Sequence, residues 1–174
     1  MSRDLAGAEP ALGSATPLRC LPRALRVPRR PLVAILVGWL TAFPISIALA
    51  MAAAFLVPGV EQPRFDVNGG AALFALVVFA PVVETLIMGA ALLVLLVFVP
   101  PAAAVFMSAI GWGIAHSLAV PIWGLVIWWP FLIFSTLFVA WRARSLILAF
   151  VIPMCVHALQ NLLPALLVAY GAAP

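Results

Sequence analysis

The chain has 174 residues, of which 67% are hydrophobic and only 8% are charged, and its mean hydropathy is +1.26. This composition excludes a soluble globular domain and indicates an integral membrane protein. The formal net charge is +4, but the arginines gather before the first apolar run and between two later runs. This distribution is typical of membrane topology, so we expect a lipid bilayer and no nucleic acid as partner.

The chain divides into a basic segment and a long apolar segment. Residues 1–30 carry six arginines and show no apolar periodicity, which predicts a flexible tail. Residues 31–174 are predicted to form one all-α domain, a bundle of about five transmembrane helices. The expected helices cover residues 31–57, 71–99, 102–120, 121–141 and 145–170.

The arginines also predict an orientation in the membrane. A tail in the cytoplasm places the polar loop 58–70 outside and the loop with Arg142 and Arg144 inside. Both basic clusters then lie on the cytoplasmic side, as the positive-inside rule requires. Because the composition is rich in alanine and arginine and lacks lysine, we expect a multi-pass protein of a bacterial inner membrane.

Four polar side chains interrupt the apolar helices and are the candidates for a functional site. Glu84 is the one carboxylate in the predicted spans, where a charge costs about 2.5–3.5 kcal/mol on insertion scales. The only two histidines, His116 and His157, lie in two other spans, and Asn161 follows His157 by one helical turn. In the predicted topology the four residues lie within a slab roughly 8 Å thick, so they could share one cavity.

This set of side chains is suited to hydrolysis. A glutamate with a histidine can hold and deprotonate a water, and a histidine with an asparagine can donate hydrogen bonds to an oxyanion. Pro81 weakens the helix just before Glu84, which gives water a way in. Alternatively, Glu84, His116 and His157 could ligate zinc at a site with an open fourth position.

Each candidate also has a structural alternative. Glu84 could be protonated and bonded to a backbone carbonyl, and His116 could bond a neighbouring carbonyl. His157 and Asn161 could form a hydrogen-bonded clamp between helices, since polar side chains often join membrane helices in this way.

The spacing of these residues resembles three motifs of one enzyme family. Residues 80–89 resemble a Glu-Glu-x-x-x-Arg helix, with Glu84 at the first glutamate. Residues 112–116 resemble a Phe-x-x-x-His helix, with Trp112 in place of phenylalanine, and residues 157–161 match a His-x-x-x-Asn helix. In their order and spacing the three resemble the CPBP (CAAX protease and bacteriocin-processing) family of intramembrane proteases.

Two positions depart from the pattern of that family. Thr85 stands where the second glutamate is usual, and Gly89 stands where the arginine is usual. If those two side chains pair with each other in typical members, the loss of both avoids one unpaired buried charge. The departures argue against a second metal-ligating acid at this position.

The resemblance implies an intramembrane endopeptidase of the glutamate type. It would hydrolyse a peptide bond of a membrane-anchored protein or peptide, as in CAAX-type or C-terminal sorting-signal processing. Glu84 would be the general base on a water that His116 helps to position, and His157 with Asn161 would stabilise the oxyanion. No cofactor is expected, and zinc is the alternative.

Two other classes of function are open at this stage. A non-catalytic membrane scaffold or bacteriocin-immunity protein could keep the same fold, and the two departures favour it. A proton-coupled transporter could use Glu84 and the histidines as a relay, although no inverted repeat is evident.

Overall fold

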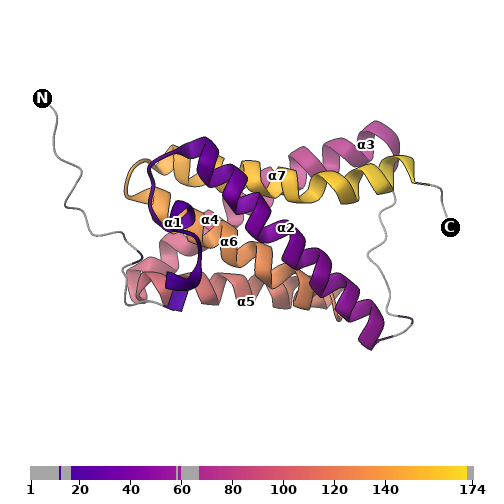
Figure 1. Ribbon diagram of the computed structural model, residues 1–174, viewed down its shortest axis with the longest axis horizontal. Helices are drawn as coiled ribbons and strands as arrows, with labels where there is room; N and C mark the ends of the chain where they lie inside the picture. Colours follow the sequence, from indigo (N-terminus) through magenta and orange to yellow (C-terminus); the bar gives the residue numbers. More distant parts are fainter. Residues whose placement is uncertain (1–11, 13–16, 58, 60–66, 172–174) are drawn as a thin grey trace, which may run out of the picture.

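The structure is a computed structural model that describes residues 12, 17–57, 59 and 67–171, and these form an all-α bundle (Figure 1). Within the described part, five helices are long and apolar enough to cross a membrane. They are α2 (Pro31–Leu56), the continuous helix Gly69–Phe98, α5 (Pro101–Ala119), α6 (Gly124–Arg142) and α7 (Leu146–Tyr170). The predicted fold class is confirmed, and the protein is a multi-pass integral membrane protein.

Prolines and one serine set the starts of several helices. Pro31 and Pro101 occupy the first turns of α2 and α5, where the missing N–H would be unpaired in any case. Ser145 caps α7, because its hydroxyl accepts a hydrogen bond from the Leu148 amide at 3.3 Å. These local signals explain why the spans begin close to where the sequence predicts them.

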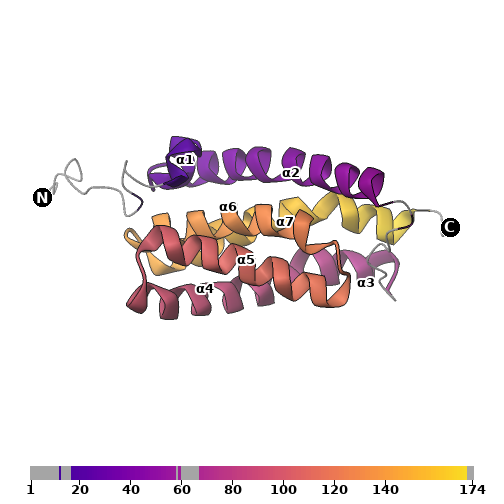
Figure 2. The same cartoon turned by 90° about the horizontal axis from the view of Figure 1, so that it is seen from below.

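Helix α6 is the centre of the bundle. It contacts α2, α5 and α7, and its residues 130–141 are all buried. Figure 2 shows α2 along one side of the molecule and α4 (Ala80–Phe98) along the other, with α6 and α7 between them. Glycines permit the close approach of α5 to α6, since a Cβ on Gly124 would overlap the carbonyl oxygen of Gly113. The closeness of this crossing brings the Trp112–His116 turn against α6.

The helix Gly69–Phe98 is irregular at the turn that precedes Glu84. It consists of α3 (Gly69–Leu73), the π-helical segment η2 (Phe74–Phe79) and α4. The Ala80 amide bonds the Ala75 carbonyl five residues back, and Pro81 follows without an amide hydrogen. The weak turn that the sequence places at Pro81 therefore takes the form of a widened helix directly before it.

The segment before α2 differs from the flexible tail that the sequence predicts. Residues 17–30 contain η1 (Pro17–Cys20) and α1 (Arg23–Arg26), and Leu18, Leu21 and Leu25 are buried in the main hydrophobic core. Leu18 lies in η1, Leu21 in the bend after it and Leu25 in α1, and the arginines between these leucines obscure the apolar contacts in the sequence. The remainder of the predicted tail, apart from the buried Leu12, lies outside the described residues.

The two arginine clusters meet at one end of the bundle. Arg144, in the turn between α6 and α7, donates hydrogen bonds to the carbonyls of Pro28 at 3.0 Å and Arg29 at 2.9 Å. Its guanidinium also lies over the Trp141 ring, 5.6 Å from the ring centroid. Both clusters therefore lie on the same side of the membrane, and we call this side the basic end.

Candidate functional site

Glu84 on α4 and His157 on α7 face each other inside the bundle. Nε2 of His157 lies 3.8 Å from Oε2 of Glu84. This separation exceeds a direct hydrogen bond, so a small rotation or a water in contact with both atoms is needed to connect them. The His157 side chain is 5% exposed and that of Glu84 is 26% exposed. The Glu84 carboxylate is therefore the more accessible member of the pair, and the His157 imidazole is almost completely buried.

Two phenylalanines of α6 hold the His157 ring. Phe134 stacks on it with ring centroids 4.8 Å apart, and Phe131 meets it edge-on at 5.5 Å. Nδ1 of His157 is buried and has no hydrogen-bond partner among the described residues. We therefore expect the proton of the neutral ring on Nε2, where a carboxylate can accept it, because a bare acceptor nitrogen is easier to bury than a bare donor.

His116 on α5 belongs to the same aromatic cluster, because its ring contacts Phe131. The ring centroids of His116 and Phe131 lie 5.8 Å apart. Trp112 stacks on Phe131, with a distance of 4.4 Å between the ring centroids. Nδ1 of His116 lies 2.9 Å from the Trp112 carbonyl oxygen, which can only accept, so Nδ1 carries the proton. Nε2 of the neutral ring is then left with a free lone pair.

Asn161 has a different partner. Its Nδ2 donates a hydrogen bond of 3.0 Å to the carbonyl oxygen of Leu76 in η2. In the i to i−5 pattern of η2, the amide that would bond this carbonyl belongs to residue 81, and Pro81 has none. Asn161 thus satisfies a carbonyl that the proline leaves unpaired, while its second N–H and its Oδ1 make no hydrogen bond within the described part.

The structure thus places the four predicted site residues in three ways. It brings Glu84 and His157 within 4 Å, it places His116 on the aromatic cluster that holds His157, and it ties Asn161 to the backbone of η2. Phe131 and Phe134 also belong to this site, because their rings contact His157, and the sequence does not single them out. Their i, i+3 spacing puts both on one face of α6, and that is the available signal.

The described residues contain no group of three or more His, Cys, Asp or Glu side chains that could hold a metal ion. The zinc alternative needs Glu84, His116 and His157 together. In the present arrangement Nδ1 of His116 is turned to a backbone carbonyl, so this ring offers only Nε2. These residues would have to move closer before they could form a three-ligand site of the usual catalytic kind.

The packing explains the glycine at position 89, and it leaves Thr85 buried without a hydrogen-bond partner among the described residues. A Cβ on Gly89 would lie 2.7 Å from the Phe138 ring and would overlap the Phe150 ring. Thr85 is fully buried, and its hydroxyl has no hydrogen-bond partner among the described residues. The space beside Gly89 is therefore occupied by two aromatic rings, so an arginine at position 89 does not fit.

Comparisons of this chain with known protein families, with curated proteins and with solved structures find no match.

Proposed function

We propose that this protein is an intramembrane endopeptidase of the glutamate type, similar to the CPBP family. The observation that carries the proposal is the Glu84–His157 pair, 3.8 Å apart and enclosed by apolar helices. Buried ionisable groups in membrane helices are costly, so their pairing across two helices favours a chemical role. Since Glu84 is the exposed member, it is the group that water and a substrate carbonyl can reach.

The proposed reaction is the hydrolysis of a peptide bond. Glu84 removes a proton from a water as the water oxygen bonds the carbonyl carbon, and the carbonyl oxygen becomes an oxyanion. Nε2–H of His157 donates to this oxyanion, and Nε2 of His116 accepts from the water and orients it. The carbon–nitrogen bond then breaks, and Glu84 returns its proton to the amine that leaves. The products are a carboxylate end and an amine end.

The position of the pair indicates the class of substrate. Glu84 lies in a membrane-spanning helix, so the peptide bond has to reach it within the bilayer. A helical substrate must unwind to expose that bond, which favours extended or glycine- and proline-weakened segments of membrane-anchored proteins. CAAX-type or C-terminal sorting-signal processing fits this requirement. We place the protein in a bacterial inner membrane with its basic end in the cytoplasm.

A second function is favoured by a separate observation. Asn161 is hydrogen-bonded to the Leu76 carbonyl, so one of the four polar side chains stabilises a contact between helices. Aromatic rings fill the space beside Gly89 and add to the packing of the helices. A non-catalytic scaffold or immunity protein would need only these contacts. The two functions differ in the role of the Glu84 carboxylate, because a scaffold has no need of its basicity.

The test compares protein termini in membranes from cells that express the wild type, Glu84→Gln or Cys155→Ala. Glu84→Gln keeps the shape of the side chain and removes the base, whereas Cys155 is half-buried two residues before His157 and so projects from another face of α7. We expect new termini with the wild type and Cys155→Ala, and none with Glu84→Gln. Identical termini in all three strains, at equal expression, would favour the scaffold.

A further inference from the structure

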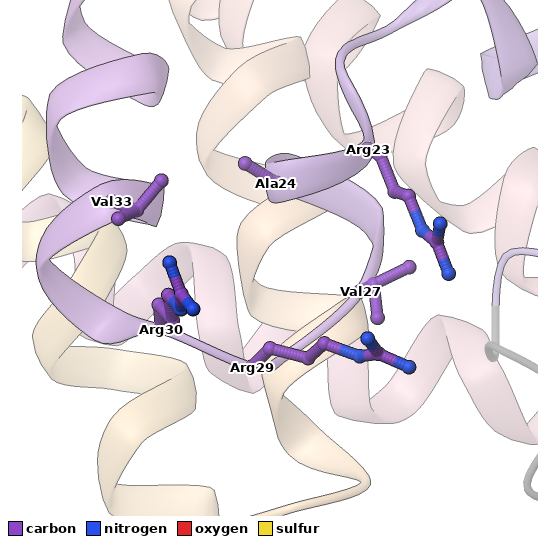
Figure 3. Close-up of a pocket in the computed structure, with 6 residues that line it drawn as sticks. All are labelled: Arg23, Ala24, Val27, Arg29, Arg30 and Val33. Atoms are coloured by element: carbon purple, nitrogen blue, oxygen red, sulfur yellow. The ribbon is translucent and has the colours of Figure 1, made fainter. Parts of the chain in front are cut away.

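A hollow of about 310 Å³ opens at the basic end, between α1 and the first turn of α2 (Figure 3). In Figure 3 Val27 lies between the side chains of Arg23 and Arg29, and Arg30 lies apart from both, near Val33. The hollow thus joins cationic groups to an apolar floor. The residues that line it are Arg23, Ala24, Val27, Arg29, Arg30 and Val33.

The backbone beneath these arginines is held in place from both sides. Arg144 bonds the carbonyls of Pro28 and Arg29, and Nε of Arg26 donates to the Leu21 carbonyl at 3.0 Å. Leu25 anchors α1, since it is fully buried in the core. The hollow is therefore built by the fold, and a ligand would not have to organise this segment when it binds.

The charge in the hollow is uncompensated within the described part of the chain. The one pair of oppositely ionisable side chains within 4.0 Å there is Glu84 with His157, so Arg23, Arg29 and Arg30 have no carboxylate partner among those residues. The three arginines that line the hollow favour a ligand with anionic oxygens, because a guanidinium donates several hydrogen bonds in a fixed geometry. The amino-terminal end of α2 adds a positive partial charge at the same place.

The surroundings of the hollow select a lipid over a free anion. The first turns of α2 expose Leu32 at 81% and Leu36 at 54%, and Val33 lies in the hollow itself. A ligand with an anionic headgroup and acyl chains can contact the arginines and this apolar surface together. We propose that the hollow binds the phosphodiester headgroup of an anionic phospholipid, with the acyl chains along α2. This inference does not depend on the proposed protease function.

The test measures lipid binding to the purified full-length protein in a neutral detergent. Phosphatidylglycerol, phosphatidylcholine or inorganic phosphate is added, and native mass spectrometry counts the bound lipid while thermal unfolding reports stabilisation. Arg23→Gln/Arg29→Gln is compared with Arg19→Gln/Arg142→Gln, a control that removes two exposed arginines that do not line the hollow.

We expect phosphatidylglycerol to bind the wild type and the control variant equally. The loss of two arginines at an anionic headgroup should weaken binding to Arg23→Gln/Arg29→Gln by roughly 30-fold. If that double variant does not fold, the single variants should each lose roughly fivefold. Equal binding of phosphatidylcholine, equal stabilisation by inorganic phosphate, or equal loss in the control would overturn the proposal.

Discussion

Two helices of this bundle, α6 and the helix Gly69–Phe98, contain a proline near the site and accommodate it in different ways. In the most apolar window of α6, 78% of the residues are buried, and the helix is regular through Pro130. In the helix Gly69–Phe98 only 28% are buried, and it widens into η2 before Pro81. Low burial alone does not widen a helix, because α2 is 22% and α7 is 33% buried in the same kind of window, and both stay α-helical through their internal prolines. The π-helical turn is therefore a local feature of the helix that carries Glu84.

The site therefore combines residues from a rigid helix, α6, with a residue from a less tightly packed helix, Gly69–Phe98. α6 supplies Phe131 and Phe134, which fix the histidine rings, and the helix Gly69–Phe98 supplies Glu84. The proposed protease would need both properties, since its catalytic groups have to be held while the helix that admits an unwound substrate gives way.

The largest expected effect comes from a cavity in the rigid element. Phe134→Ala should lower the free energy of unfolding by about 3–5 kcal/mol, because Phe134 is fully buried and stacks on His157. Phe98→Ala is the matched control, since Phe98 is 78% exposed on the other helix, and its effect should stay within about 0.5 kcal/mol. Unfolding in detergent, followed by circular dichroism, measures both. Equal losses would show that α6 is not the rigid element.

A smaller effect is expected at Gly89, where the helix Gly69–Phe98 packs against α6 and α7. Gly89→Ala should cost about 1–3 kcal/mol, because the new methyl group meets the rings of Phe138 and Phe150. Phe150→Ala creates space, so the same alanine should cost less in that background. Gly111→Ala is the control, since a Cβ there has nothing within 4 Å. The same unfolding assay measures all of these variants. If Gly89→Ala costs as much in the Phe150→Ala background as in the wild type, the new methyl group does not clash with Phe150.

Sequence reasoning predicts the fold well here because lipid imposes a simple rule. A run of about 20 apolar residues has to form a helix, so the five spans follow from hydropathy. The proximity of Glu84 and His157 follows from the same rule, since isolated polar groups are costly in a bilayer and tend to meet. The pairing of Asn161 does not follow, because its partner is the backbone carbonyl of Leu76, which any residue at that position would supply. Likewise, Leu18 and Leu25 are hidden by the arginines beside them.

The smallest predicted effect tests the link between Pro81 and Asn161. Asn161→Ala leaves the Leu76 carbonyl without its partner and should cost about 0.6–1.7 kcal/mol, the range for hydrogen bonds between membrane helices. Pro81→Ala supplies an amide that can bond this carbonyl, so Asn161→Ala should cost less in that background. The control is Gln160→Ala, since Oε1 of Gln160 is buried without a hydrogen-bond partner in the described part.

The same double-mutant cycle separates the two roles of Asn161. If its amide only satisfies the Leu76 carbonyl, cleavage lost in Asn161→Ala should return with Pro81→Ala, because the backbone then needs no side-chain donor. If the free N–H of Asn161 binds the oxyanion, Pro81→Ala should restore stability and leave cleavage impaired. Stability and cleavage that recover together would assign the asparagine to the helix contact alone.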